Sequence, residues 1–122
     1  METSATICST LHEAIEHRDI ERMLSLYADN AELKVVDRDH PPSHPLELRG
    51  KPAIEGYLRD IFGRDMTHRV LDEVVGEDRL SFTEDCTYGD GTHVFVSSTI
   101  NLQGDKIARE VEVQAWDETP SH

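Results

Sequence analysis

Apolar side chains in the first half of the chain recur every three to four residues, the spacing that places them on one face of a helix. Three such faces can be drawn: Ile7, Leu11, Ala14 and Ile15; Ile20, Met23, Leu24 and Tyr27; and Ile54, Tyr57, Leu58 and Ile61. Thr3 or Ser4 precedes the first face and Asp19 the second, as N-cap residues do. Pro52 suits the first turn of the third. The pattern predicts two short helices and a third over residues 50–62.

The pattern changes to alternation in residues 31–37 and again in the last half of the chain, which is typical of strands. Turn-forming stretches at residues 76–79 (GEDR), 89–91 (GDG) and 103–106 (QGDK) divide the second region into about four antiparallel strands. Residues 37–45 (DRDHPPSHP) contain three prolines, which exclude regular structure. Helices first and strands last indicate an α+β domain whose helices pack on one face of the sheet.

The alternation also predicts which side chains face the core, because each hairpin must bring apolar residues to the same face. We pair Leu102 with Ile107 across the QGDK turn. The face that this register turns inward carries Leu80, Phe82, Glu84, Cys86, Tyr88, Val94, Val96, Ser98, Ile100, Leu102, Ile107, Arg109, Val111, Val113 and Ala115. The opposite face, with Glu110 and Glu112, is too polar for a core. We expect it to be solvated or to form a wet homodimer interface anchored by Phe95 and Trp116.

Composition narrows the classes of partner. The chain has 122 residues, enough for one domain, with 12 basic and 25 acidic residues and a net charge of -13. This charge argues against binding to nucleic acid or to an anionic membrane. Apolar runs are too short for a membrane span, and the first ten residues do not resemble a signal peptide, so we expect a cytoplasmic protein. Cys8 and Cys86 lack the spacing of a metal or redox motif and are interpreted as free structural thiols.

Three stretches resemble the SnoaL-like branch of the NTF2-like superfamily. Residues 18–31 (RDIERMLSLYADNA) are similar to the second helix of that family running into its first strand. Residues 48–57 (LRGKPAIEGY) resemble its Gly-x-x-Ala-Ile helix start, and residues 104–117 (GDKIAREVEVQAWD) resemble its last strand. The resemblance covers nearly the whole chain. It implies one domain over residues 1–122, with an NTF2-like cone fold in which three N-terminal helices pack on a curved, mainly antiparallel sheet around a small-molecule pocket.

The same resemblance leaves the activity open, because the superfamily includes ketosteroid isomerases, cyclases, dehydratases, hydrolases and non-catalytic domains. Ketosteroid isomerases use an aspartate base and an oxyanion hole made by a tyrosine and a protonated aspartate. The matching positions here are Val35 for the base and Leu11 and Ser98 for the donors. We therefore expect no 3-ketosteroid isomerase activity and interpret these three residues as lining the substrate site. Asp37, which shares the facing of Val35, is a candidate replacement base.

Glu84 and Arg109 are charged residues on the predicted apolar face. Such a group must find a partner, reach water in a cavity or shift its pKa. The predicted register separates their Cα atoms by about 16 Å, too far for a direct pair. We expect Glu84 to line a pocket as a catalytic group, and Arg109 to bind an anionic or carbonyl group of the ligand. The alternative for each is a long side chain that reaches solvent at the edge of the sheet.

His68 begins the first strand of the meander, within residues 67–72 (THRVLD), which resemble the His-x-x-x-Asn/Asp sequence of some SnoaL-like enzymes, in which the histidine acts as acid or base. Its facing stays open, because the GEDR turn leaves the register ambiguous by one residue. A surface or capping histidine is the alternative. Tyr57 lies where relatives place a pocket-lining aromatic residue, and ordinary core packing is the alternative for it.

The leading hypothesis is metal-independent acid–base chemistry on a small, partly apolar molecule, such as isomerisation, cyclisation, dehydration or hydrolysis. Its catalytic candidates are His68, Glu84 and Asp37, with Tyr57, Arg109, Ser98, Val35 and Leu11 as binding residues. The alternative is a non-catalytic ligand-binding or assembly domain. We expect no cofactor and no metal site. The nearest motif, His40 and His44 with Asp37 and Asp39, lies in the proline-rich loop, which does not hold side chains at a fixed spacing and is interpreted as a lid.

Overall fold

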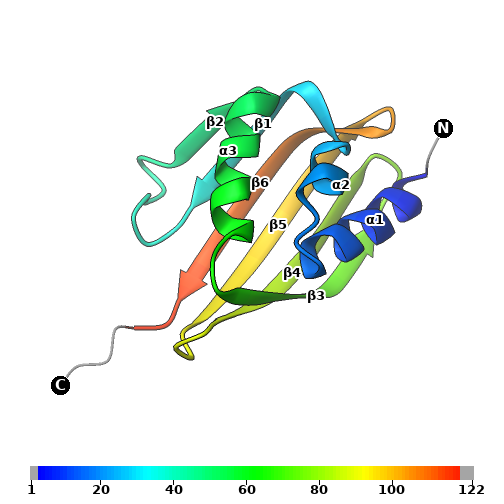
Figure 1. Cartoon of the computed structure of the whole chain (residues 1–122). Coiled ribbons are helices and arrows are strands. Elements are labelled where there is room, and N and C mark those ends of the chain that lie inside the picture. Colours follow the sequence, from blue (N-terminus) through cyan, green and yellow to red (C-terminus); the bar gives the residue numbers. More distant parts are fainter. Residues whose placement is uncertain (1–2, 119–122) are drawn as a thin grey trace.

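The protein's structure, a computed structural model, describes residues 3–118. In chain order the elements are α1 (Ser4–Glu16), α2 (Ile20–Leu24), β1 (Tyr27–Val36), β2 (Leu46–Arg49), α3 (Lys51–Phe62), β3 (Met66–Val75), β4 (Arg79–Tyr88), β5 (His93–Gln103) and β6 (Lys106–Trp116). The strands form one curved sheet in the order β2-β1-β6-β5-β4-β3, and the three helices cover one face of it (Figure 1). The predicted α+β cone is confirmed.

Strand pairing is antiparallel throughout this sheet except between β1 and β6, which run parallel. Local signals explain most of the elements. Thr3 caps α1 by accepting from the Thr6 amide at 3.1 Å, and Asp19 caps α2 by accepting from the Arg22 amide at 3.1 Å. Within the described part of the chain, no helix has the length and apolar character needed to cross a membrane.

The structure differs from the predictions in the start of β1 and in the presence of an additional strand, β2. α2 ends at Leu24, so Tyr27 begins β1 four residues before the predicted strand. β2 has no counterpart among the predicted strands, because its four residues alternate weakly, with half-buried and exposed positions. It forms because β1 offers a free edge, and Leu33 pairs with Leu48 across it.

The core lies between the helices and the concave face of the sheet. Its fully buried members include Ile7 and Leu11 of α1, Ile54 of α3 and Val35 of β1. Each such side chain contributes about 1.5–3 kcal/mol by leaving water. The apolar helix faces predicted from the sequence are therefore the surfaces that hold the helices on the sheet.

β6 contains a bulge that reverses the predicted facing of most of the strand. Leu102 pairs with Ile107 as predicted, but Asn101 pairs with Arg109, so Ala108 is an extra residue on β6. One extra residue turns every following side chain to the other face of the sheet. The predicted inward facing of Arg109, Val111, Val113 and Ala115 is therefore wrong. The side chains that point toward the helices instead are Glu110, Glu112, Gln114 and Trp116.

Candidate functional site

A cavity of about 60 Å³ lies between the concave face of the sheet and the helices. One water molecule needs roughly 10–15 Å³ measured in this way, so the cavity accommodates several waters or a small ligand group. Much of its wall is apolar, with contributions from Leu58, Phe62, Met66, Phe82, Val94 and Val96. The polar part of the wall comes mainly from β3, β4 and β6, with Tyr27 of β1 and with Arg64 from the segment between α3 and β3.

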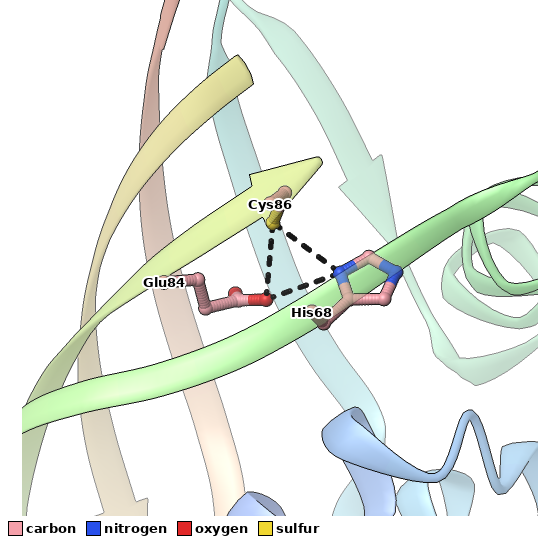
Figure 2. A group of neighbouring side chains, drawn as sticks. All are labelled: His68, Glu84 and Cys86. Atoms are coloured by element: carbon pink, nitrogen blue, oxygen red, sulfur yellow. Dashed lines mark hydrogen bonds and ion pairs between the residues drawn. The ribbon is translucent and has the colours of Figure 1, made fainter. Parts of the chain in front are cut away.

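His68, Glu84 and Cys86 form one polar cluster in this wall (Figure 2). His68 on β3 pairs directly with Cys86 on β4, and Glu84 lies two residues before Cys86, so all three side chains share the inner face. The Cys86 Sγ lies 3.3 Å from His68 Nδ1 and 3.8 Å from Glu84 Oε1, and the latter two atoms are 3.5 Å apart. All three residues are buried. His68, whose facing the sequence left open, therefore points inward.

Two further carboxyl groups enter the cavity from β6, each bonded to a tyrosine. The Tyr27 hydroxyl donates to Glu110 at 2.5 Å, and the Tyr57 hydroxyl donates to Glu112 at 3.0 Å. The Gln114 amide also donates to Glu112, at 2.6 Å, and accepts from the Trp116 indole at 3.0 Å. The tyrosines come from β1 and α3, so three separate elements hold this network together.

The environment of these carboxyl groups favours their protonated forms. Burial, followed by the charge of Glu112, raises the pKa of Glu110 to about 8, although the bond from Tyr27 opposes the change. Burial and then Glu84 raise the pKa of Glu112 to about 7, against the bonds from Gln114 and Tyr57. Both carboxyls are therefore poised to exchange a proton near neutral pH, as general acid–base catalysis requires.

A second, open hollow of about 720 Å³ adjoins the cavity and shares part of its wall. Trp116 belongs to both walls, stacks on Tyr88 with ring centroids 5.6 Å apart, and is covered by the Arg38 guanidinium 3.9 Å from its ring. Arg64 donates to the Tyr88 hydroxyl at 2.7 Å and to Asp60 at 2.6 Å. This aromatic stack therefore lines both the inner cavity and the outer hollow.

The structure brings together only part of the predicted site. His68 and Glu84 meet in the cavity, and Tyr57 bonds to a cavity carboxylate. Asp37 lies outside, in the wall of the outer hollow, where it accepts bonds from the His40 amide at 2.8 Å and ring at 2.9 Å. Its carboxylate therefore orders the proline-rich loop.

The remaining candidates do not contact the cavity. Leu11 and Val35 are buried at 1% and 0% exposure within the core cluster, and Ser98 is also fully buried. The Ser98 hydroxyl lies beside Glu110 and acts to lower the pKa of that carboxyl, but it forms no hydrogen bond of ordinary geometry among residues 3–118. Arg109 is exposed on the outer face of the sheet, so its predicted position inside the pocket is wrong, and the bulge at Ala108 is the reason. Trp116, predicted to lie outside, faces inward for the same reason.

Sequence reasoning missed Glu110, Glu112 and Gln114, and it gave Cys86 a purely structural role. A register that buries two glutamates is unfavourable on sequence grounds, because a buried charge without a partner is costly. Tyr27 and Tyr57 were the evidence in the sequence that buried carboxyl groups could be accommodated. A tyrosine on an apolar helix face needs a hydrogen-bond partner when it is buried, and each of these finds a glutamate.

Comparison with known proteins identifies the class. Residues 9–110 match the SnoaL-like domain family, and the chain belongs to that family. No curated protein matches the sequence at a significant level.

Solved structures show the same fold at low identity. An NTF2-like protein of unknown function from Mesorhizobium loti has a TM-score of 0.82 and 15% identity, over 92% of this chain and 90% of that one. A candidate ketosteroid isomerase from Kribbella flavida has a TM-score of 0.77 and 12% identity, over 98% and 81%. A candidate polyketide cyclase from Sinorhizobium meliloti has a TM-score of 0.68 and 16% identity, over 88% and 93%.

Proposed function

We propose that this SnoaL-like protein is an enzyme that carries out acid–base chemistry on a small, partly apolar molecule bound in the cavity. The observation that carries the proposal is the convergence of Glu110 and Glu112, with pKa values near neutrality, in one enclosed cavity with His68 and Glu84. Perturbed carboxyl groups in an apolar cleft are characteristic of catalytic sites. The fold is also that of a candidate polyketide cyclase and a candidate isomerase, which is consistent with this class.

The two β6 carboxyl groups suit different roles at neutral pH. Glu112 lies half-buried beside the aromatic stack and accepts hydrogen bonds from Gln114 and Tyr57, which favour its charged form, so we assign it as the base that accepts a proton from substrate carbon or water. Glu110 is more deeply buried, and burial favours its protonated form, so we assign it to donate a hydrogen bond or a proton to a substrate oxygen. Tyr57 and Gln114 orient Glu112, while His68 and Glu84 face the substrate from the opposite strands.

Proton exchange on a carbonyl probe tests this function without knowledge of the natural substrate. Cyclohexanone and ethyl acetoacetate would be incubated with the protein in D₂O, and α-deuteration followed by NMR. We expect exchange above the buffer rate, reduced about 100-fold in Glu112→Gln. Glu77→Gln is the matched control, because Glu77 is exposed on a turn. Binding of the probes without any exchange would contradict catalysis.

That outcome would favour the second candidate, a non-catalytic ligand-binding or assembly domain. The observation in its favour is the absence of ketosteroid isomerase chemistry at Leu11, Val35 and Ser98, which are core residues here. For the same reason the proposed enzyme does not isomerise 3-ketosteroids.

We also propose that the protein forms a homodimer through the outer face of the sheet. The bulge in β6 turns Val111, Val113 and Ala115 to this face, where Ala115 pairs with Phe95. Phe95 is 50% exposed and Val113 is 47% exposed, so the face is more apolar than the sequence pattern predicted. A neighbouring copy would remove this patch from water.

A further inference from the structure

We infer that His68, Glu84 and Cys86 form a binding site for a divalent transition-metal ion of the zinc type, held inside the cavity. His68 Nδ1, Glu84 Oε1 and Cys86 Sγ converge from two neighbouring strands (Figure 2), and the donor atoms of the three residues lie within 4.8 Å of one another. The sequence predicted no metal site. This inference does not depend on the proposed acid–base reaction, since metal binding is measured without turnover.

The distances match one face of a zinc coordination tetrahedron. Bonds of about 2.0–2.1 Å to nitrogen or oxygen and about 2.3 Å to sulfur separate tetrahedral ligand atoms by roughly 3.4 Å for N···O and 3.5–3.6 Å for S···N and S···O. The corresponding separations are 3.5 Å, 3.3 Å and 3.8 Å. Each agrees to within about 0.3 Å. An ion can therefore contact all three atoms with only small side-chain adjustments.

The arrangement differs from that of a nucleophilic thiol with a histidine base. In such a relay the thiol contacts one ring nitrogen and the acidic residue contacts the other. Here Cys86 and Glu84 both lie against Nδ1 of His68. The other nitrogen, Nε2, is buried and has no hydrogen-bond partner among residues 3–118. Three donor atoms directed at one point are expected of metal ligands, whereas a proton relay needs them in a line.

The charges around the cluster also favour a cation. Glu84, Glu110 and Glu112 all line the cavity, and in the described part of its wall the only lysine or arginine is Arg64, which is already paired with Asp60. A divalent ion would offset the negative charge of Glu84 and of ionised Glu112, and it would stabilise the Cys86 thiolate, whose pKa is raised by burial and by Glu84 when no metal is bound.

The ligand types select the metal. A thiolate and an imidazole prefer zinc and similar transition ions, whereas magnesium and calcium prefer oxygen ligands. Three protein ligands leave the fourth tetrahedral position for water or substrate, as in catalytic zinc sites. When bound, the ion would supply a Lewis acid beside Glu110 and Glu112, and the proton-transfer roles would rest on those two residues.

Titration of the chelator-treated protein with Co²⁺ tests the site, because cobalt substitutes for zinc and has an absorption spectrum. We expect one Co²⁺ per chain, with visible bands of tetrahedral cobalt and a near-ultraviolet thiolate charge-transfer band. Adding Zn²⁺ should abolish both. Cys86→Ser should lose the charge-transfer band and weaken Zn²⁺ binding at least 100-fold, since even changes to groups that support metal ligands cost about 10–100-fold.

The second cysteine provides the matched control. Cys8 is buried too, but it bonds to Glu73 at 3.3 Å, away from the cavity, so Cys8→Ser should keep the full cobalt spectrum. Glu84→Gln preserves side-chain size and should weaken binding without unfolding the protein, as a thermal melt would verify. The inference is overturned if wild-type protein shows no stoichiometric thiolate band, or if Cys8→Ser removes the band and Cys86→Ser does not. Deuterium exchange on the carbonyl probes reports on the acid–base function separately.

Discussion

Ile100 of β5 lies opposite Glu110 of β6, and not opposite Arg109. This pairing directs a glutamate into the cavity and an arginine to the outer surface. The glutamate tolerates this position because Tyr27 donates to it and because its pKa rises, so that the buried carboxyl is neutral at pH 7. An arginine cannot give up its proton in this way. The register therefore buries the charge that can be neutralised.

Glu110 should make the protein less stable as the pH rises. Its pKa is about 8 in the folded protein, whereas an unperturbed glutamate, as in the unfolded chain, has a pKa of 4.5. Between these two pH values the folded state therefore binds more protons than the unfolded state. The free energy of unfolding therefore falls from about pH 4.5 to pH 8 and then levels off. Glu110→Gln should reduce this dependence in urea unfolding curves, with the raised pKa of Glu112 accounting for part of what remains, whereas Glu77→Gln should leave it unchanged.

Tyr57→Phe should raise the pKa of Glu112 further. The Tyr57 hydroxyl donates to this carboxylate at 3.0 Å, and its loss removes a bond that lowers the pKa. We also expect a loss of about 1–2 kcal/mol in stability, because Gln114 bonds to the same hydroxyl. NMR titration of labelled glutamate carboxyls would measure the shift. Tyr88→Phe is the control, since Tyr88 bonds to Arg64, and an equal shift in that variant would contradict the assignment.

Arg109→Met should change neither the cavity nor metal binding. Arg109 is exposed on the outer face, and surface substitutions of this kind usually alter stability by no more than about 0.5 kcal/mol. Thermal melts and the cobalt titration would measure both effects. A marked gain in cobalt binding in this variant would contradict the outward placement of Arg109, because removing a guanidinium from inside the cavity would relieve its repulsion of the bound cation.

Phe95→Asp or Val113→Asp should convert the proposed homodimer to a monomer. Both side chains are about half exposed on the outer face of the sheet, and a charge there would have to be desolvated in the interface. Light scattering at tens of micromolar would measure the mass. Val75→Asp provides a control, because Val75 is 43% exposed but pairs with Leu80, whose side chain faces the helices and not the outer face. A wild-type monomer, or a dimer that survives both substitutions, would contradict the proposal.

The helices, the strands β3 to β6 and the family were predictable because each depends on local pattern. Residues of α1 and α3 repeat at helical spacing, and the alternation along β4 is enough to place Glu84 and Cys86 on the inner face. The strand β2 was not predictable in this way. Four residues carry too little alternation, and the strand forms only where the edge of β1 is available for pairing.

The sequence by itself determined the fold class, the core faces of the helices and the inward facing of Glu84, since these follow from periodicity within single elements. Only the tertiary structure decided the facing of β6 and the meeting of His68 with Glu84 and Cys86. The extra residue at Ala108 is favourable because Tyr27 and Tyr57, which lie 83 and 55 positions away from their glutamates, supply hydrogen bonds inside the cavity. A hydrogen bond over such a separation leaves no local pattern, and a one-residue change of register reverses every side chain beyond it.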